Sequence, residues 1–262
     1  MKILTNKQFK KILDTHAEDI LKQRERYYEN EILKKQTELL MLQNQINPHF
    51  LYNALECIRA KAVLNDLPEI ADMTYTISNF FRYSISTKGD LVSLSDELNV
   101  IYNYMKIQQY RFRDRFSLQV NLPDSWATIK DSLIPKLTLQ PIIENSIVHA
   151  FNDITDEAII TVEIIHTKKH INIRVSDNGK GMDTSKLQQL KRSLEKELFI
   201  SLEPSNTKGT GIALWNVNRR LKLVFGDTYG LCISSSPALG TDIEIHIPYI
   251  SINSNDFSKK ED

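Results

Sequence analysis

A histidine within a helical pattern is the first residue of this sequence whose type and position indicate chemistry. In the stretch LQNQINPHFLYNAL, residues 42–55, apolar residues recur at helical spacing, and Pro48 directly precedes His49. A proline inside a helix costs roughly 3 kcal/mol because it removes a backbone hydrogen bond and crowds the preceding turn. Asn53 follows four residues after His49, on the same helical face. Two interpretations of Pro48 stay open: a hinge that controls access to the imidazole, or a bend that serves packing only.

Glycines gather in three short phrases of the second half of the chain. Glycine lets backbone amides approach a ligand closely. The phrase GTGIAL precedes a predicted helix, whose first N–H groups favour phosphate. A single D-x-G-x-G phrase also suits an ordinary turn, but the combination predicts a phosphate site. The candidate residues for it in DNGKG and GTGIAL are Gly179, Gly181, Gly209, Thr210 and Gly211.

Polar side chains near these glycines complete a candidate nucleotide site. Asp177 ends a predicted strand, where its carboxylate can accept hydrogen bonds from an exocyclic amine such as that of adenine. Asn145 offers an amide oxygen, a ligand type that suits Mg²⁺ together with phosphates and waters. His149 is interpreted either as a phosphate donor or as a helix-surface histidine, and Glu144 either as a polarising group or as a solvated one.

Composition gives no electrostatic reason to expect nucleic acid or an anionic membrane as the main partner, since 33 basic residues balance 33 acidic ones. The two cysteines, Cys57 and Cys232, lie far apart in apolar patterns, and we expect both in the core of a protein from a reducing compartment. No run approaches the roughly 20 apolar residues that span a bilayer. The first residues lack the apolar stretch of a signal peptide.

Two helices are predicted in the first half of the chain. One runs from about residue 21 to 62 and the other from about 68 to 84, and the short loop between them makes a helical hairpin. The second carries an apolar stripe that includes Ile70, Met73, Ile77 and Phe80. Such a stripe predicts a four-helix bundle with a second copy, hence a homodimer. The alternative is that the stripe packs on the downstream domain.

The second half alternates between helical and strand patterns. Helices are predicted from Ser95, as N-cap, to about 111, over 134–151 and over 211–225. Strands are predicted at 116–122, as a hairpin over 158–177, and at 230–236 and 241–248. The polar segment 184–208 is expected to be a mobile lid, although plain surface loops share its composition. The fold class is therefore α+β, a helical hairpin followed by an α/β sandwich.

Several of these phrases resemble those of a known family. ENSIVHAF, SDNGKGMD and GTGIALWNVNRRL resemble the N, G1 and G2 boxes of the GHKL ATP-binding fold, which histidine kinases, gyrase-type ATPases and Hsp90 share. QINPHFLYNAL resembles the phospho-acceptor box of the LytS/YesM-type sensor histidine kinases, whose pattern also includes FFRYS, VSLSDELNVIYNYMKIQQYRF and IPKLTLQPIIEN. The resemblance covers roughly residues 25 to 248.

The resemblance implies roles for individual residues. His49 matches the phosphorylated histidine, and Asn53 resembles the Asn or Thr that orients hydrolytic water in kinases with phosphatase activity. Asn145 matches the Mg²⁺ ligand and Asp177 the adenine-reading carboxylate, whereas Arg220 matches an arginine of less certain role. The glycines of the two phrases match flexible phosphate and lid positions. Two departures are Ala213, where a third glycine is common, and Phe50, where many histidine kinases have an acid.

The family also implies an organisation and partners. Expected parts are a signalling helix at 1–40, a dimerisation and phosphotransfer hairpin at 41–90, a catalytic domain at 91–250 and a polar tail at 251–262. Expected ligands are ATP and Mg²⁺. The expected partner is a response regulator with a LytTR-type or AraC-type DNA-binding domain, and the chain is expected to be the cytoplasmic part of a membrane-anchored protein. Alternatives are another GHKL ATPase, a protein serine kinase, or a catalytically silent dimeric scaffold.

Overall fold

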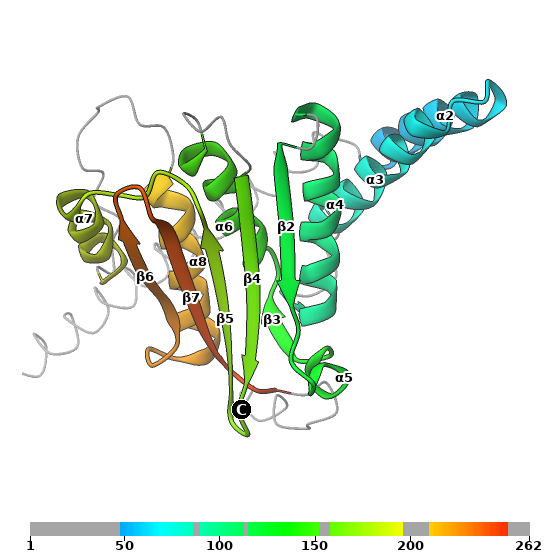
Figure 1. Cartoon of the computed structure of the whole chain (residues 1–262). Helices are drawn as coiled ribbons and strands as arrows, with labels where there is room; N and C mark the ends of the chain where they lie inside the picture. Colours follow the sequence, from blue (N-terminus) through cyan, green and yellow to red (C-terminus); the bar gives the residue numbers. More distant parts are fainter. Residues whose placement is uncertain (1–47, 86–89, 113–114, 152–157, 196–209, 251–262) are drawn as a thin grey trace, which may run out of the picture. The chain divides into compact units, whose positions relative to one another are not determined.

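The structure, a computed structural model, describes residues 48–85, 90–112, 115–151, 158–195 and 210–250 (Figure 1). The chain forms two compact units, Met1–Ala54 and Leu55–Asp262. Most of the predicted first helix and the whole predicted signalling helix lie outside the described residues. The hinge assigned to Pro48 therefore stays a prediction, as do the predicted domain bounds.

Two helices open the described chain, α2 (Pro48–Leu64) and α3 (Pro68–Ile85), and α4 (Leu94–Phe112) follows. The second predicted helix is thus confirmed nearly to the residue. In α3 the side chains of Thr74, Thr76 and Ser78 are buried, and the two threonines donate hydrogen bonds to backbone carbonyls four residues earlier. Of the apolar stripe, Phe80 packs on Tyr104 of α4, with 5.9 Å between the ring centroids. Part of the apolar stripe is therefore packed against α4 of the same chain, as in the alternative interpretation.

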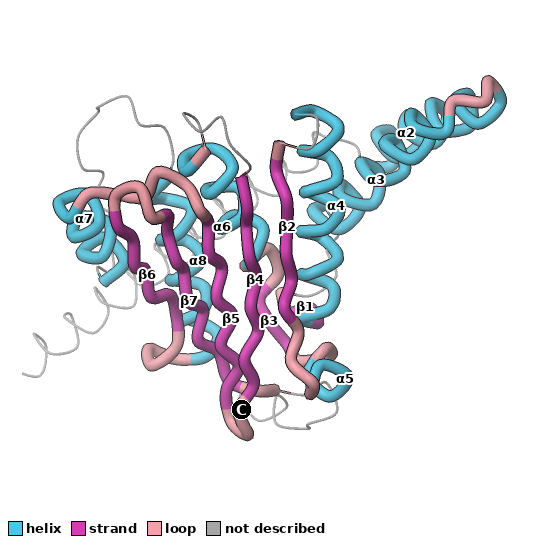
Figure 2. Tube along the Cα trace, in the orientation of Figure 1, coloured by secondary structure: helices cyan, strands magenta, loops and turns pink. Residues whose placement is uncertain are grey.

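A five-stranded mixed sheet forms the centre of the second unit (Figure 2). Its strands are β2 (Phe116–Asn121), β4 (Ala158–His166), β5 (His170–Asp177), β7 (Gly240–Pro248) and β6 (Gly230–Ser236), in that spatial order. Strands β2 and β4 pair in parallel, and all the other pairs are antiparallel. The predicted hairpin over 158–177 is confirmed.

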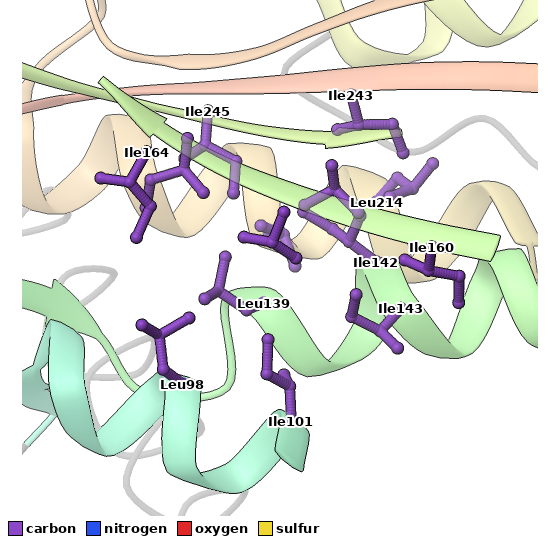
Figure 3. Packing of buried hydrophobic residues seen from close by; sticks show 14 of the residues in the cluster. Leu98, Ile101, Leu139, Ile142, Ile143, Ile160, Ile164, Leu214, Ile243 and Ile245 are labelled. Atoms are coloured by element: carbon purple, nitrogen blue, oxygen red, sulfur yellow. The ribbon is translucent and has the colours of Figure 1, made fainter. Parts of the chain in front are cut away.

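Helices cover one face of this sheet, which makes the predicted α/β sandwich. The covering helices are α4, α6 (Leu139–Asn145) and α8 (Thr210–Phe225) (Figure 1). Alternate residues of the strands point into the core, such as Ile160 of β4 and Ile245 of β7, both with 0% exposure (Figure 3). Burial of apolar surface at roughly 25 cal/mol per Å² is the main force that holds these layers together.

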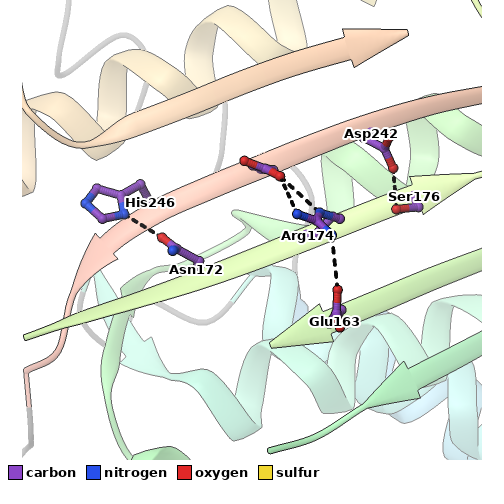
Figure 4. A network of polar contacts seen from close by, with 7 residues as sticks. Glu163, Asn172, Arg174, Ser176, Asp242 and His246 are labelled. Atoms are coloured by element: carbon purple, nitrogen blue, oxygen red, sulfur yellow. Dashed lines mark hydrogen bonds and ion pairs between the residues drawn. The ribbon is translucent and has the colours of Figure 1, made fainter. Parts of the chain in front are cut away.

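The other face of the sheet is polar, and its side chains form cross-strand pairs (Figure 4). Arg174 on β5 bridges two carboxylates on the neighbouring strands, Glu163 at 3.3 Å and Glu244 at 2.8 Å. Exposed ion pairs of this kind contribute about 0–1 kcal/mol each, so this face owes little of its stability to them. The strands alternate between apolar and polar residues because helices cover one face of the sheet, whereas this face is exposed to solvent.

Both cysteines differ from expectation, because each is exposed. Cys232 lies on β6 next to Ile233, which is buried, so the alternation of side chains along a strand turns the cysteine outward. Cys57 lies on the exposed side of α2 in the single chain. Apolar neighbours in the sequence were therefore not enough to predict whether a cysteine lies on the buried or the exposed face of its helix or strand.

Two boundaries in the second unit also differ from prediction. The N-cap of α4 is Ser93, not Ser95, because Ser93 Oγ accepts a hydrogen bond from the backbone N–H of Asp96 at 3.1 Å. The predicted helix over 134–151 is shorter at its start, since Leu133–Pro135 forms strand β3, which pairs with β1 (Leu91–Ser93). A short helix, α5 (Trp126–Ile129), precedes β3.

The first part of the predicted lid is a helix, α7 (Thr184–Glu195). Asp183 caps it by accepting a hydrogen bond from the backbone N–H of Lys186 at 2.8 Å. At its other end the side-chain amide of Asn218 in α8 donates to the Leu194 carbonyl at 2.9 Å. Residues 184–195 are therefore anchored to α8, and the remainder of the predicted lid lies outside the described residues.

Candidate functional site

A buried carboxylate at the end of β5 is the centre of the candidate site. Asp177 is 9% exposed. Its Oδ1 accepts hydrogen bonds from the backbone N–H groups of Gly179 at 3.0 Å and Thr241 at 3.2 Å, and its Oδ2 accepts one from Ser146 Oγ at 3.0 Å. Burial raises the pKa of Asp177, whereas these hydrogen bonds oppose the rise. The carboxylate is thus held in one orientation by three separate segments of the chain.

Asn145 lies immediately before the serine that contacts Asp177. It is the last residue of α6, and a π-helical turn, η1 (Ser146–Ala150), follows directly. The Ser146 backbone N–H donates to both Ile142 O and Ile143 O, so the last bonds of α6 are shared between two carbonyls where η1 begins. Single π turns are frequent at functional sites. This turn brings Ser146 to Asp177 and so joins the predicted Asn145 and Asp177 into one neighbourhood.

The side chain of Asn145 has a buried polar atom without a protein partner in the described part of the chain. Its Nδ2 is buried and has no hydrogen-bond partner among the residues that the structure describes. An amide can present either its nitrogen or its oxygen at such a position, and a buried polar atom without a partner costs about 1–3 kcal/mol. A ligand that takes up this group would remove that cost. The Asn145 amide therefore fits the predicted Mg²⁺ ligand.

Two lysines are close enough to His149, which lies near the end of η1, to affect its pKa. The pKa of His149 is lowered, first by partial burial and then by the positive charges of Lys186 and Lys180. The imidazole is consequently neutral at pH 7, with two lysines close enough to affect it. This combination suits a polyphosphate. Sequence reasoning missed both lysines, although Lys180 stands inside the DNGKG phrase between two candidate glycines.

Two of the candidate glycines are required by the packing of their own loop. A Cβ at Gly179 would lie 2.3 Å from the Cβ of Ala150. At Gly181, φ is +64°, and a Cβ would lie 1.9 Å from the Ser236 carbonyl oxygen. The absence of a side chain at both positions therefore lets the loop lie this close to η1 and β6. The phosphate contact that the resemblance implies for these glycines stays a prediction.

The second glycine phrase is only partly described. Gly209 lies outside the described residues, and α8 begins at Thr210, with Gly211 as its second residue. Ala213, the departure from the family pattern, lies in the first turn of this helix and is half-buried. The start of α8 agrees with the prediction that the phrase leads directly into a helix.

Arg220 is placed away from the Asp177 group. Its Nη2 donates a hydrogen bond to the Leu137 carbonyl at 2.7 Å, and Leu137 precedes α6, whereas Asn145 ends that helix. Burial is the main cause that lowers the pKa of Arg220. The structure thus brings Asn145, His149, Asp177 and the first glycine phrase together, but not Arg220.

The candidate phospho-acceptor lies on α2, in the first unit. The side-chain amide Nδ2 of Asn53 lies 3.2 Å from Nδ1 of His49, and both residues are exposed. The predicted shared helical face is therefore confirmed, and the pair is in contact. Which atom donates depends on the imidazole tautomer and on the orientation of the amide. His49 and Asn53 belong to one unit and the Asp177 group to the other, so the two sites are described separately.

Two family models match the chain, one over the segment with His49 and Asn53 and the other over the segment with the Asp177 group. Residues 37–116 match the family model described as "Histidine kinase". Residues 131–251 match the model described as "Histidine kinase-, DNA gyrase B-, and HSP90-like ATPase". Residues 131–251, which include strands β4 to β7, helices α6 and α8 and the Asp177 group, therefore match an ATPase domain of that class, which implies the use of ATP.

The chain belongs to the histidine kinases, and its relatives are sensor kinases. It is 40% identical to "Sensor histidine kinase YesM" of Bacillus subtilis over 84% of this chain and 35% of that protein. It is 32% identical to "Sensor protein LytS" of Staphylococcus epidermidis over 87% of this chain and 36% of that protein, and 33% identical to the Bacillus subtilis LytS over 82% and 34%. The chain thus spans about a third of the length of these relatives.

Among the residues that the structure describes, no helix combines the length and the apolar character needed to cross a bilayer.

Proposed function

We propose that this chain is the catalytic portion of a two-component sensor histidine kinase. It transfers the γ-phosphoryl group of ATP to His49 and then to an aspartate of a response regulator. The observation that carries the proposal is the convergence of the buried Asp177 carboxylate, the unpartnered Asn145 amide and the cationic surroundings of His149 in one neighbourhood. Asp177 suits the adenine base, Asn145 suits a metal ion bound to the phosphates, and the positive charges near His149 suit the remaining phosphate charge.

The roles of these residues follow from their chemistry. The three donors orient the carboxylate of Asp177 so that it can accept a hydrogen bond from the adenine amine. Asn145 is the residue that would hold Mg²⁺, which when bound neutralises charge on the phosphate oxygens. His149, Lys180 and Lys186 stabilise the remaining phosphate charge. We keep Gly209, Thr210 and Gly211 as phosphate-side residues of the same site, and Arg220 as a residue whose family role is untested.

Asn53 positions the nucleophile. With its amide oxygen turned toward His49, it accepts a hydrogen bond from Nδ1–H and leaves the lone pair on Nε2. That lone pair forms the P–N bond while the bond between the γ-phosphorus and the bridging oxygen of ADP breaks, and ADP leaves with the electron pair. The phosphorylated ring then releases its Nδ1 proton to solvent, since His49 is exposed. The residue that follows is Phe50, so the neighbouring position supplies no base for that proton, unlike in many histidine kinases.

We also propose partners and a location for this protein. The hairpin exposes large apolar side chains, including Val63 at 56%, Leu64 at 82% and Ile70 at 47%, and these suit a homodimer interface between two copies. The phosphorylated partner is a response regulator with a LytTR-type or AraC-type DNA-binding domain, so this chain itself has no need to bind nucleic acid. The whole protein is anchored in the plasma membrane by segments outside this sequence, with the present chain in the cytoplasm.

One experiment tests the proposal. The purified chain is incubated with Mg²⁺ and γ-labelled ATP, and the label is expected to survive base and to be lost in acid, as a phosphohistidine does. His49→Gln should abolish the label, whereas the matched control His166→Gln, on β4, should keep it. Acid-stable label would indicate a serine kinase. Nucleotide binding without any label would indicate another ATPase or a silent scaffold.

A further inference from the structure

A second buried carboxylate lies outside the nucleotide site and has four partners. Glu97 of α4 is 1% exposed. Its Oε1 accepts hydrogen bonds from the backbone N–H of Leu137 at 2.6 Å and from Tyr83 Oη at 2.6 Å. Its Oε2 accepts from the backbone N–H groups of Thr138 at 2.9 Å and Leu139 at 2.8 Å. No step of the proposed reaction uses this residue, so its burial needs another explanation.

Three of these partners are consecutive backbone N–H groups at the start of α6: those of Leu137, of the N-cap Thr138 and of Leu139, the first residue of the helix. Thr138 is the N-cap of that helix, but its side chain makes no cap hydrogen bond and donates instead to the Pro135 carbonyl at 2.6 Å. The carboxylate of Glu97, about forty positions earlier in the chain, caps the helix in place of the Thr138 side chain. A carboxylate at a helix N-terminus satisfies unpaired N–H groups and interacts favourably with the helix dipole. Since α6 ends at Asn145, Glu97 fixes one end of the helix whose other end carries the predicted metal ligand.

The fourth partner connects this cap to the hairpin. Tyr83 lies in the last turn of α3, and the Lys136 ammonium group, from the loop before α6, lies 5.1 Å from the centroid of its ring. Burial and the charge of Glu97 raise the pKa of Tyr83, so the phenol stays protonated and donates at physiological pH. On the other side of the same loop, Arg220 donates to the Leu137 carbonyl. The end of α3 and the start of α6 thus share one carboxylate.

We propose that Glu97 and Tyr83 are positioning residues that couple the end of α3 to α6, and through α6 to Asn145. A buried carboxylate that loses one donor must rearrange toward the others or expose itself, because an unsatisfied buried charge is costly. Movement of α3 therefore alters the cap of α6. The consequence for metal-bound nucleotide rests on the proposed function, whereas the coupling between the two helices does not.

A ligand-free experiment tests the coupling. In the full chain, Tyr83→Phe keeps the ring and removes only the hydroxyl, and amide hydrogen exchange at Leu137, Thr138 and Leu139 is expected to accelerate roughly tenfold. Tyr110→Phe is the matched control. It removes another tyrosine–carboxylate hydrogen bond between α4 and α3, that of Tyr110 with Asp72 at 2.5 Å, and neither residue belongs to α6 or to the loop before it. Unchanged exchange in Tyr83→Phe, or equal acceleration in Tyr110→Phe, would overturn the proposal.

A second measurement tests the route to the metal ligand. Glu97→Gln, or Tyr83→Phe if the former fails to fold, is expected to reduce by several-fold the gain in nucleotide affinity that Mg²⁺ provides. Affinity without Mg²⁺ should change little, because Asn145 is proposed to act through the ion. Equal losses with and without Mg²⁺ would refute this route and indicate a structural role only. If the unmodified chain binds no nucleotide, the proposed function fails, and the exchange experiment still decides the coupling.

Discussion

Replacement of Asp177 by asparagine gives a sharp test of adenine recognition, because the change is nearly isosteric. The amide oxygen can keep the two backbone hydrogen bonds from Gly179 and Thr241, and the new amide nitrogen faces Ser146 Oγ, which can accept. We therefore expect the variant to fold, with an unfolding midpoint in urea close to that of the original chain. The variant loses only the negative charge and the carboxylate oxygen that is proposed to accept a hydrogen bond from adenine.

The magnitude follows from the kind of hydrogen bond that is lost. A hydrogen bond to a charged acceptor contributes about 1.5–3 kcal/mol. Since each 1.4 kcal/mol corresponds to about a factor of ten in affinity, ATP binding should weaken roughly 10- to 150-fold. Guanine carries a carbonyl where adenine carries its amine and cannot donate to Asp177 there, so GTP affinity should change little. The variant is expected to lose discrimination between the two bases.

The assay is calorimetric titration of the chain with ATP and with GTP at fixed Mg²⁺. Asp242→Asn is the matched control, because Asp242 is a neighbouring carboxylate on the open face of the sheet, where it accepts from Ser176 Oγ. A fall in ATP affinity of less than threefold, or equal falls for ATP and GTP, would refute the role assigned to Asp177.

The same residue predicts a pH dependence. Burial raises the pKa of Asp177, so on acidification the carboxylate takes up a proton at a higher pH than an exposed aspartate does. ATP affinity should therefore fall as the pH is lowered toward that raised pKa, and this fall should be absent from Asp177→Asn.

Three further predictions concern charge and stability. The pKa of His149, measured by NMR, should lie below 6.5 and should rise when ATP binds, because phosphate charge offsets that of the two lysines; an unchanged value would contradict the phosphate role. Ile173→Ala, at a fully buried position of β5, should lower the free energy of unfolding in urea by about 2–5 kcal/mol, and a loss below 1 kcal/mol would mean that the core is placed wrongly. Arg174→Ala should lower it by less than about 1 kcal/mol in low salt, since its ion pairs are exposed, and a larger loss would show that they are more than surface contacts.

Local patterns were enough to predict the helices and strands that carry the site. The alternation over 158–177 predicted the hairpin and placed Asp177 at a strand end, because side chains of a strand alternate between two faces whatever lies beyond. The four-residue spacing of His49 and Asn53 likewise predicted that they share one helical face, since this depends only on the helical repeat, and the structure adds their contact. The first glycine phrase could be interpreted because a positive φ, as at Gly181, restricts the residue type locally.

Tertiary structure decided everything that depends on which elements lie together. The lysines beside His149 and the cap that Glu97 provides for α6 join residues tens of positions apart, and no local period encodes such pairs. The outward side of Cys232 likewise depends on which face of its strand the helices cover. Periodicity is a property of one segment, whereas burial, charge environment and long-range hydrogen bonds arise only when packed layers bring segments together. The sequence by itself therefore determined the elements and most of the reacting groups, and the packing of those elements determined their surroundings.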